Sequence, residues 1–368
     1  MAESLGLRPV INAAATLTKL GGSVMPPPVI SAMAAAAQSF VDMHELQRRV
    51  GERIAAITHN EACYVTSGAA AGITLTVAAC ITGDDRTRLG DFPYLDGRPR
   101  EVIVWRSQRN SYDYAARMTG ARLREVGPTA AELANACCER TACILWFAGT
   151  HYKAGALPLA DIVAVARQHA IPVLVDAAAQ IPPIANLWRF TGEFGADAVI
   201  FSGGKGLRGP QPTGLVLGRR AIIEACRANG SPNHAIGRAM KVGKEELAGI
   251  LAAVEWSLAQ NEPALLASYE EAVICWLSEI GALPGVAVER GYPSEAGQPH
   301  SRAIIHLLPS APLNRDALVT ALWEQSPRIA VGTVGADAIA LNPQTLQPGE
   351  AAIVTAAVKQ ALAGLGGR

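Results

Sequence analysis

The hydrophobic positions of this chain fall into short runs that alternate with helical stretches. From Glu45 onward, Leu46, Val50, Ile54 and Ile57 recur at the three- to four-residue spacing of an amphipathic helix. Strand-like runs rich in β-branched residues follow at 62–66, 101–105, 142–147, 171–175, 197–201 and 214–218. Because strands that alternate with helices favour parallel pairing, this α/β pattern predicts a mostly parallel, helix-covered sheet.

The pattern changes on either side of this region. Residues 1–44 predict an N-terminal arm with a proline-initiated helix, because proline suits the first turn of a helix. Residues 45–230 form the predicted large domain. Two long helical stretches, several strand-like segments and a final alanine-rich helix come next, so 231–368 is predicted to be a smaller α+β C-terminal domain.

Composition restricts the class of protein. Lys and Arg number 32, as do Asp and Glu, and no block of like charge is present, so a nucleic-acid partner is not expected. The N-terminus lacks a secretory signal, and the uncharged stretch 62–83 contains glycine, serine and threonine, which favour a strand, loop and buried helix over a membrane span. We therefore expect a cytoplasmic protein with no membrane partner.

The seven cysteines lie mostly in apolar surroundings and form no CxxC pair. This pattern favours reduced core residues over a disulfide framework or a metal site.

Candidate chemistry follows the strand-like runs, where α/β sheets bind their ligands. Lys205 lies in FSGGKGLRGPQPTG, after the run 197–201 and between Gly203, Gly204 and Gly206. A lysine among small residues is open to covalent catalysis, in which its amine bonds an aldehyde or carries a proton. An incidental lysine in a flexible surface loop is the alternative.

An acidic residue ends another of these runs. Asp176 follows IPVLV, where an unpaired buried carboxylate would be costly. Opposite a protonated pyridine nitrogen the carboxylate would be paired, and Ala178 is small enough to lie beneath a flat ring. A helix cap after the strand is the alternative.

The third motif is YVTSGAAAG, in which a strand ends at Thr66, turns through Ser67 and Gly68, and a helix begins at Ala69. Backbone N–H groups at a helix N-terminus, with the Ser67 hydroxyl, suit a phosphate. Ser202, three residues before the lysine, is a second candidate phosphate ligand. Turns of this kind are common, so the motif is informative only together with the others.

An amine, a carboxylate and a phosphate cradle are what pyridoxal 5′-phosphate (PLP) requires of a protein. Their order along the chain is the order found in the aminotransferase superfamily. A fourth element, a side chain against the ring face, is expected in RSQRNSYDYA, where Gln108 or Arg109 could cover the ring and Tyr112 could line the pocket. Arg109 could equally be a solvated surface charge.

Six segments together resemble the selenocysteine-synthase-like family: RPVINAAATLTKLGGSVMPPPVISAM, ELQRRVGERIAAIT, VTSGAAAG, VLVDAAAQIPP, FSGGKGLRGPQPTG and GRAMKVGKEELAGILAA. The resemblance extends over nearly the whole chain and is closest to the D-glucosaminate-6-phosphate ammonia-lyase branch. It implies the aspartate aminotransferase-like fold, PLP fold type I, and a homodimer or higher homo-oligomer.

The resemblance also implies residue roles. Lys205 would hold PLP as a Schiff base, Asp176 would pair with its pyridinium nitrogen, and Ser67, Gly68 and Ser202 would neighbour its phosphate. The segment RSQRN departs from the family, because it lacks the histidine expected near the ring in relatives. The substrate can therefore differ from a sugar acid.

The residues expected to bind substrate are mostly basic. Arginine binds carboxylates in a bidentate way, and the small domain offers Arg302 and Arg328, with Arg328 favoured because PRIAVG begins a strand after a loop. Arg238 and Lys241, in GRAMK, could approach an active site or form ion pairs at a domain boundary. His151, in GTHYKAG, is a candidate acid or pocket residue, with a surface histidine as the alternative.

The predicted reaction is that of a lyase acting on an amino acid or amino sugar acid. Lys205 would abstract the α-proton, a β-hydroxyl would leave, and hydrolysis of the enamine would give ammonia and a 2-keto acid. The same carbanion could serve a racemase, an aldolase or a β-replacement transferase, which the sequence does not separate. A protein that binds PLP without turnover is the remaining alternative.

Overall fold

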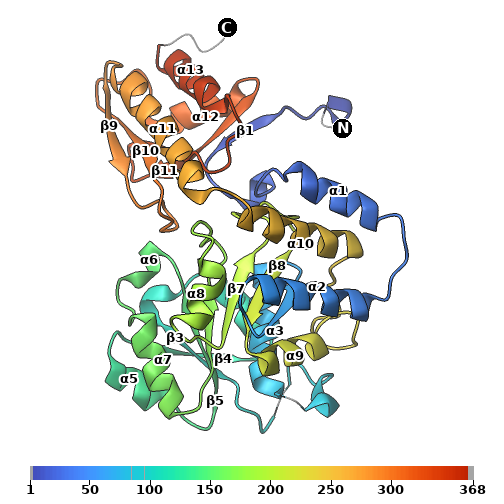
Figure 1. The fold of residues 1–368 in the computed structure, drawn as a ribbon. Coiled ribbons are helices and arrows are strands. Elements are labelled where there is room, and N and C mark those ends of the chain that lie inside the picture. The colour runs from blue at the N-terminus through green and yellow to red at the C-terminus, as the bar shows by residue number, and fades with distance from the viewer. Residues whose placement is uncertain (1–2, 84, 95, 364–368) are drawn as a thin grey trace. The chain divides into compact units, whose positions relative to one another are not determined.

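The chain folds into two compact units, shown as a ribbon in Figure 1. The computed structural model describes residues 3–83, 85–94 and 96–363. The larger unit comprises Met25–Ala259, and the smaller comprises Met1–Val24 together with Gln260–Arg368. Each unit has its own sheet and its own hydrophobic core, as is typical of separate domains.

The larger unit is built on a seven-stranded sheet. Its strands, in spatial order, are β2 (Ala62–Thr66), β8 (Gly214–Gly218), β7 (Ala198–Ser202), β6 (Val173–Asp176), β5 (Thr141–Phe147), β3 (Glu101–Trp105) and β4 (Arg122–Val126). The strands from β4 through β3, β5 and β6 to β7 run parallel, whereas β8 is antiparallel to both neighbours. The predicted mostly parallel sheet is therefore confirmed.

Helices cover both faces of this sheet. They are α1 (Pro27–Ala36), α2 (Met43–Ile57), α3 (Ala69–Thr82), α4 (Asp113–Arg117), α5 (Ala130–Ala136), α6 (Thr150–Lys153), α7 (Leu159–Gln168), α8 (Asn186–Gly192), α9 (Arg220–Asn229) and α10 (Lys244–Leu258). One core includes α3 and α9, and the other includes α2, α7, α8 and α10. Strands buried on both faces are apolar throughout, which is why the sequence pattern predicts them well.

Helix α3 follows β2 after a short turn and packs on the strands in the middle of the sheet. Its buried hydroxyls are paired, since Thr76 donates to the Gly72 carbonyl at 2.8 Å and Thr82 donates to the Ala78 carbonyl at 3.0 Å. The stretch 62–83 thus forms the strand, turn and buried helix that its composition predicts. Among the described residues, no helix has both the length and the apolar character needed to cross a membrane.

The hydrophobic pattern does not predict β4. Its sequence, RLREV, carries three charged residues, and the strand lies at the edge of the sheet, where it pairs only with β3. An edge strand tolerates charge because one side faces solvent, and the charge discourages pairing with another chain.

The smaller unit contains a five-stranded sheet. Its strands, in spatial order, are β1 (Val10–Ala13), β11 (Arg328–Val334), β12 (Ala338–Leu341), β10 (Arg302–Leu307) and β9 (Val286–Gly291). Its core is completed by α11 (Glu262–Gly281), α12 (Arg315–Glu324) and α13 (Glu350–Leu362). β1 pairs in parallel with β11, from Val10 opposite Arg328 to Ala13 opposite Val331.

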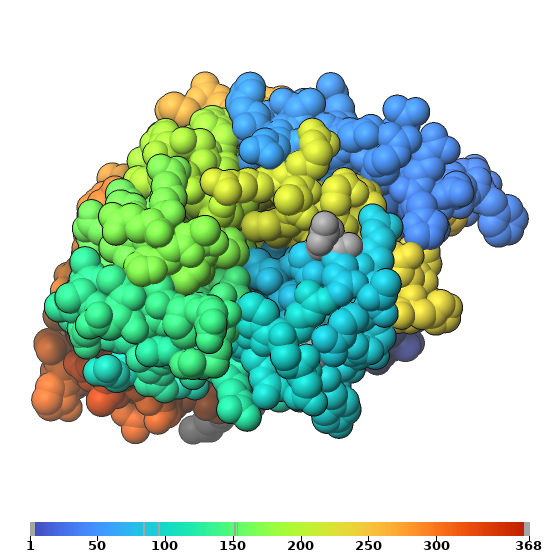
Figure 2. All heavy atoms as spheres, turned by 90° about the horizontal axis from the view of Figure 1, so that it is seen from below, coloured from blue at the N-terminus to red at the C-terminus, as the bar shows by residue number. Residues whose placement is uncertain are grey.

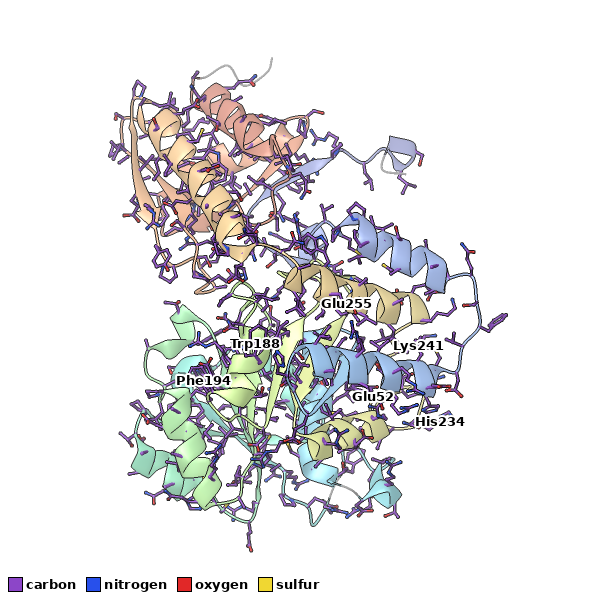
Figure 3. The ribbon with its side chains drawn as sticks, viewed as in Figure 1. Glu52, Trp188, Phe194, His234, Lys241 and Glu255 are labelled. Atoms are coloured by element: carbon purple, nitrogen blue, oxygen red, sulfur yellow. The ribbon has the colours of Figure 1, made fainter. Side chains whose placement is uncertain are left out.

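The boundaries of the two units differ from those expected from the sequence. The sequence pattern places the start of the C-terminal domain at residue 231, shortly after α9, whereas the larger unit ends at Ala259. Helix α10 belongs to the larger unit because Leu247 and Ile250 are buried in the same core as α2. Arg53 of α2 also pairs with Glu255 of α10, labelled in Figure 3, at 2.9 Å. The expected arm 1–44 is shared between the units, since β1 joins the smaller sheet and α1 packs on α10.

A pair of helical glycines tests how tightly α2 packs on the sheet. A Cβ at Gly51 would lie 2.3 Å from the Cys63 carbonyl oxygen, whereas a Cβ at Gly192 of α8 would meet nothing within 4 Å. We expect Gly51→Ala to destabilise the larger unit by about 1–3 kcal/mol, because overpacking outweighs the gain in helix propensity. Thermal melting followed by circular dichroism measures the change.

Gly192→Ala is the matched control. It gains helix propensity with no steric cost, so we expect it to stabilise the protein by up to about 1 kcal/mol. Equal melting temperatures for the two variants would contradict the close approach of α2 to β2.

Candidate functional site

The polar residues predicted from the sequence gather at the carboxyl ends of the central strands. β6 lies between β5 and β7, and the sheet register places Phe147 opposite Asp176 and Asp176 opposite Ile200. Directly paired residues point to the same face of a sheet. Since Phe147 and Ile200 belong to the core that includes α3, the Asp176 side chain also lies on the α3 face.

The Asp176 carboxylate is buried, with only 7% of the residue exposed. Its Oδ1 accepts a hydrogen bond from the Ala178 N–H at 2.9 Å. Burial raises the pKa of Asp176, and this effect is opposed by the Ala178 N–H and by the charge of Lys205. A buried carboxylate in this state favours a cationic or proton-donating ligand.

Lys205 lies in the loop that follows β7, and this loop is packed rather than open. A Cβ at Gly204 would lie 2.5 Å from the Gln211 Cα, and one at Gly206 would lie 2.1 Å from the Ile181 carbonyl oxygen. The glycines therefore allow close packing, which differs from the expectation that they leave the lysine uncovered. Burial lowers the pKa of Lys205, and the Asp176 charge opposes this. An amine with a lowered pKa is more readily available as a nucleophile.

The turn predicted to be a phosphate cradle, at Ser67 and Gly68, leads from β2 into α3. Gly68 adopts φ 89° as the N-cap of α3, and no side chain caps this helix end, so its first N–H groups remain available to an anion. The Thr66 hydroxyl donates to the Gly68 carbonyl at 2.9 Å and fixes the turn. Gly214 permits the close approach of β8, since a Cβ there would lie 2.6 Å from the Gly68 carbonyl carbon.

The remaining predicted cofactor neighbours lie on the same strand ends. Ser202 ends β7, and its N–H donates to the Ala178 carbonyl at 3.3 Å. Ala69 begins α3. The buried Asp176 carboxylate, with Lys205 as the cation that lowers its pKa, fits the pyridine nitrogen of PLP. The N-terminus of α3, which no side chain caps, fits the phosphate of PLP.

Gln108, expected near the ring, is held by hydrogen bonds to backbone groups. It ends the short 3₁₀ helix η4 (Arg106–Gln108) and is fully buried. Its Nε2 donates to the Phe147 carbonyl at 3.1 Å and to the Tyr152 carbonyl at 3.0 Å, and its Oε1 accepts from the Phe147 N–H at 2.9 Å. The amide thus joins the end of β3 to the end of β5, with both of its N–H donors committed to backbone carbonyls.

Arg109 and Tyr112 lie nearer the surface. Arg109 forms ion pairs with Asp113 and Glu125, which raise the pKa of its guanidinium and commit it to α4 and β4. The surface-charge alternative for Arg109 therefore describes its contacts better than ring stacking does. Tyr112 precedes α4 and is 52% exposed.

The two arginines of the smaller unit have different surroundings. Arg302 Nη1 lies 3.6 Å from Glu295 Oε2, and the Arg328 guanidinium carbon lies 4.7 Å from the centre of the Trp323 ring. In each arginine the buried Nε has no hydrogen-bond partner among the described residues.

Of the other expected substrate residues, two lie on a loop and one falls in a helix. Arg238 and Lys241, the latter labelled in Figure 3, are exposed on the segment between α9 and α10. His151 falls in α6, and its side chain lies outside the described part of the chain.

The sequence analysis did not single out Tyr152, which the structure brings to the site. Its ring centre lies 5.5 Å from that of Phe147, the register partner of Asp176. Burial raises the pKa of Tyr152, and the charges of Asp176, Tyr112 and Asp113 raise it further. An aromatic residue within a few positions of a strand end was the available signal, but GTHYKAG offers His151 more prominently.

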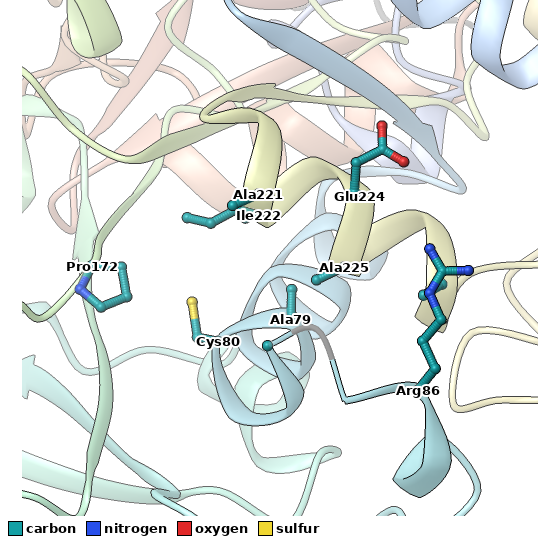
Figure 4. Close-up of a pocket in the computed structure, with 10 residues that line it drawn as sticks. Ala79, Cys80, Arg86, Pro172, Ala221, Ile222, Glu224 and Ala225 are labelled. Atoms are coloured by element: carbon teal, nitrogen blue, oxygen red, sulfur yellow. The ribbon is translucent and has the colours of Figure 1, made fainter.

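A cavity of about 440 Å³ lies at the C-terminal end of α3, whereas the turn at Gly68 lies at its N-terminal end. It is lined by small apolar residues of α3 and α9, with Arg86 and Glu224 at its rim (Figure 4). The space-filling view in Figure 2 shows α9 and the segment after α3 next to each other on this face. The cavity contains neither Lys205 nor Asp176, so it is separate from the site described above.

Comparison with known proteins adds three sequence matches. A model of the L-seryl-tRNA selenium transferase family matches residues 113–265. The D-glucosaminate-6-phosphate ammonia lyase of Salmonella typhimurium is 38% identical over 262 residues, 69% of each chain. A 5′-C-glycyluridine monooxygenase-decarboxylase of a Streptomyces species is 36% identical over 322 residues, which make up 84% of this chain and 78% of the relative.

Solved structures match over the whole length. A D-glucosaminate-6-phosphate ammonia-lyase has a TM-score of 0.85 and 32% identity, and the match covers 99% of this chain and 98% of that one. An aspartate aminotransferase of Thermus thermophilus has a TM-score of 0.59 at 14% identity, which shows a shared fold alone. The expected aspartate aminotransferase-like fold, PLP fold type I, is therefore confirmed.

The raised pKa of Asp176 leads to a test of stability against pH. In the cofactor-free protein, the folded-state pKa of this acid exceeds its unfolded value, so its ionisation costs stability as pH rises through the folded-state pKa. We expect Asp176→Asn to melt a few degrees above the wild type at pH 8. The difference should shrink as pH is lowered through the folded-state pKa, because the aspartate then becomes protonated. Melting curves of both cofactor-free proteins at several pH values measure this effect.

Asp161→Asn, on the exposed first turn of α7, is the control and should change the melting temperature little at any pH. A lower melting temperature for Asp176→Asn than for the wild type at pH 8 would show that the carboxylate has a stabilising partner in the cofactor-free protein.

Proposed function

Because the chain belongs to the family of the D-glucosaminate-6-phosphate ammonia lyase and the L-seryl-tRNA(Sec) selenium transferases, we propose that it is a PLP-dependent lyase. Its substrate is an amino acid or amino sugar acid, from which it removes the α-proton and a β-substituent to give ammonia and a 2-keto acid. The observation that carries this proposal is the pairing of a buried acid, Asp176, with a desolvated amine, Lys205, at the carboxyl ends of β6 and β7.

Each residue has a defined task in this proposal. Lys205 would bond the cofactor's aldehyde carbon through Nζ and later carry the α-proton. Asp176 would keep a proton on the pyridine nitrogen, and the Gly68 and Ala69 N–H groups with the hydroxyls of Ser67 and Ser202 would hold the phosphate. Bound PLP would supply the electron sink that makes the α-proton acidic.

The lowered pKa of Lys205 supports its use as a base. An amine with a lowered pKa loses its proton more readily than an ordinary exposed lysine and so can accept one from the substrate. The close packing of Gly204 and Gly206 fixes the loop, so this amine is held in one place.

For the substrate carboxylate we propose Arg302 in preference to Arg328. Arg302 stands among polar groups, since its partner Glu295 also accepts from the Asn342 amide at 3.0 Å. Arg328 instead stacks on the Trp323 ring. A polar substrate suits the first environment better, although the strand-start pattern of PRIAVG favours the second arginine.

A second candidate function rests on the 36% identity to a protein named a monooxygenase-decarboxylase, which is spread over 84% of this chain. Lys205 and Asp176 would then take part in a reaction that consumes dioxygen and releases the substrate carboxylate as carbon dioxide. This reaction differs from those of a racemase, an aldolase or a transferase.

We also propose that the enzyme is a cytoplasmic homodimer or higher homo-oligomer. The described cysteines are all unpaired, as is usual in a reducing compartment. A symmetric assembly is common for soluble enzymes of this size.

The reaction can be identified with PLP-loaded protein and a panel of D- and L-β-hydroxy amino acids and amino sugar acids, with and without a phosphate group. We expect ammonia and 2-keto acid in equal amounts from at least one member. Lys205→Ala should lower the rate by about 10³-fold or more, because it removes both the covalent attachment and the base.

Dioxygen uptake and carbon dioxide release are followed in the same reactions. Carbon dioxide without 2-keto acid would favour the monooxygenase-decarboxylase candidate. A cofactor spectrum that responds to substrate with none of these products would reject both functions and leave a racemase, an aldolase or a transferase.

The choice between the two arginines can be tested by substitution. Arg302→Ala should raise KM by about 10- to 100-fold, since a charge-assisted hydrogen bond contributes roughly 1.5–3 kcal/mol. Arg328→Ala, the matched control, should change KM much less. A larger KM effect for Arg328→Ala would assign the carboxylate to the strand-start arginine.

A further inference from the structure

Tyr152 flanks the buried acid on the side away from the lysine. It lies in α6, which follows β5, and its ring contacts Phe147 at 5.5 Å between centres. Phe147 is the register partner of Asp176, and β5 lies on the opposite side of β6 from β7, the strand that leads to Lys205. Two groups that can carry a proton, the phenol and the amine, therefore lie on segments that follow the strands on either side of β6, the strand that ends at Asp176.

The position of Tyr152 is fixed by hydrogen bonds to its backbone. Its carbonyl accepts from Gln108 Nε2 at 3.0 Å, and its N–H donates to the Gly149 carbonyl at 3.1 Å. The same buried Gln108 amide also holds both backbone groups of Phe147. The buried Gln108 amide thus positions the backbone of Tyr152 relative to the end of β5, where Phe147 lies.

The chemistry of elimination needs two proton carriers. A base removes the α-proton, and an acid is required when the leaving group is a hydroxyl, because hydroxide leaves poorly without a proton. Burial and the neighbouring negative charges raise the pKa of Tyr152, so the phenol keeps its proton at neutral pH. A phenol in this state is able to donate when a stronger base develops beside it.

Resting on the proposed lyase function, we propose that Tyr152 is a further catalytic residue, the general acid for the leaving group. As the bond from Cβ to oxygen breaks, its electron pair stays with the oxygen, and the Tyr152 O–H proton joins that oxygen. Water leaves, and the phenolate regains a proton from solvent. Lys205 holds the α-proton, so the two protons travel through different residues.

Leaving groups of different basicity test this role. Holoenzyme is assayed with serine and with β-chloroalanine, each in the configuration that the wild type accepts. Tyr152→Phe should lower kcat for serine by about 10²- to 10³-fold, because it removes the acid and preserves the ring. It should change kcat for β-chloroalanine by less than about twofold, since chloride leaves without a proton.

Two further measurements separate this role from a structural one. The absorption spectrum of the bound cofactor and the exchange of the substrate α-proton with D₂O should be the same in Tyr152→Phe and the wild type, because Lys205 and Asp176 are unchanged. Tyr114→Phe removes a hydroxyl from a tyrosine of α4 that is 62% exposed, and it should match the wild type with both substrates.

Equal losses with serine and β-chloroalanine, or no loss with either, would overturn the general-acid role while the elimination itself stands. A wild type that exchanges the α-proton but eliminates neither from these two compounds nor from any member of the substrate panel would overturn the lyase function and this role of Tyr152 together.

Discussion

The burial of one carboxylate governs the site of this protein. Asp176 ends a strand whose other residues are fully apolar, and its own burial raises its pKa. One backbone N–H and the charge of Lys205 only partly offset that cost. A pyridine nitrogen that shares a proton with the acid would complete the pairing, so the cofactor and the fold depend on each other electrostatically.

The surrounding loops hold this charged pair in place because they pack without Cβ atoms. Gly204 and Gly206 bring the lysine loop against its neighbours, and Gly214 lets β8 approach the turn at Gly68. An alanine at any of these positions would have to displace backbone atoms. The glycines that suggest an open, flexible loop in the sequence thus produce a rigid one, and rigidity is what a positioned amine requires.

The sequence predicts the central strands because each is buried on both faces and apolar throughout. It predicts Lys205 and Asp176 because each follows such a strand, where a charged residue stands out. It does not predict β4, which is charged because it lies at an edge, nor the pairing of Val10 with Arg328, which joins opposite ends of the chain. The boundary at α10 also depends on packing against α2, which no local pattern reveals.

The contacts of one predicted site residue could not be read from the sequence. A glutamine in a polar segment resembles a ligand contact, yet Gln108 is fully buried and bonds three backbone groups of the next strand end and α6. These partners lie 39 and 44 residues along the chain from Gln108, so sequence spacing gives no sign of them.

The lysine and the acid alone do not decide the reaction, because proteins named for ammonia loss and for oxidative decarboxylation have similar sequence identity to this chain. A shared electron sink makes the carbanion, and its fate depends on which groups deliver protons around it. The ends of β3 and β5, which Gln108 ties together and which carry Tyr152, are therefore where the reactions of these relatives have room to diverge.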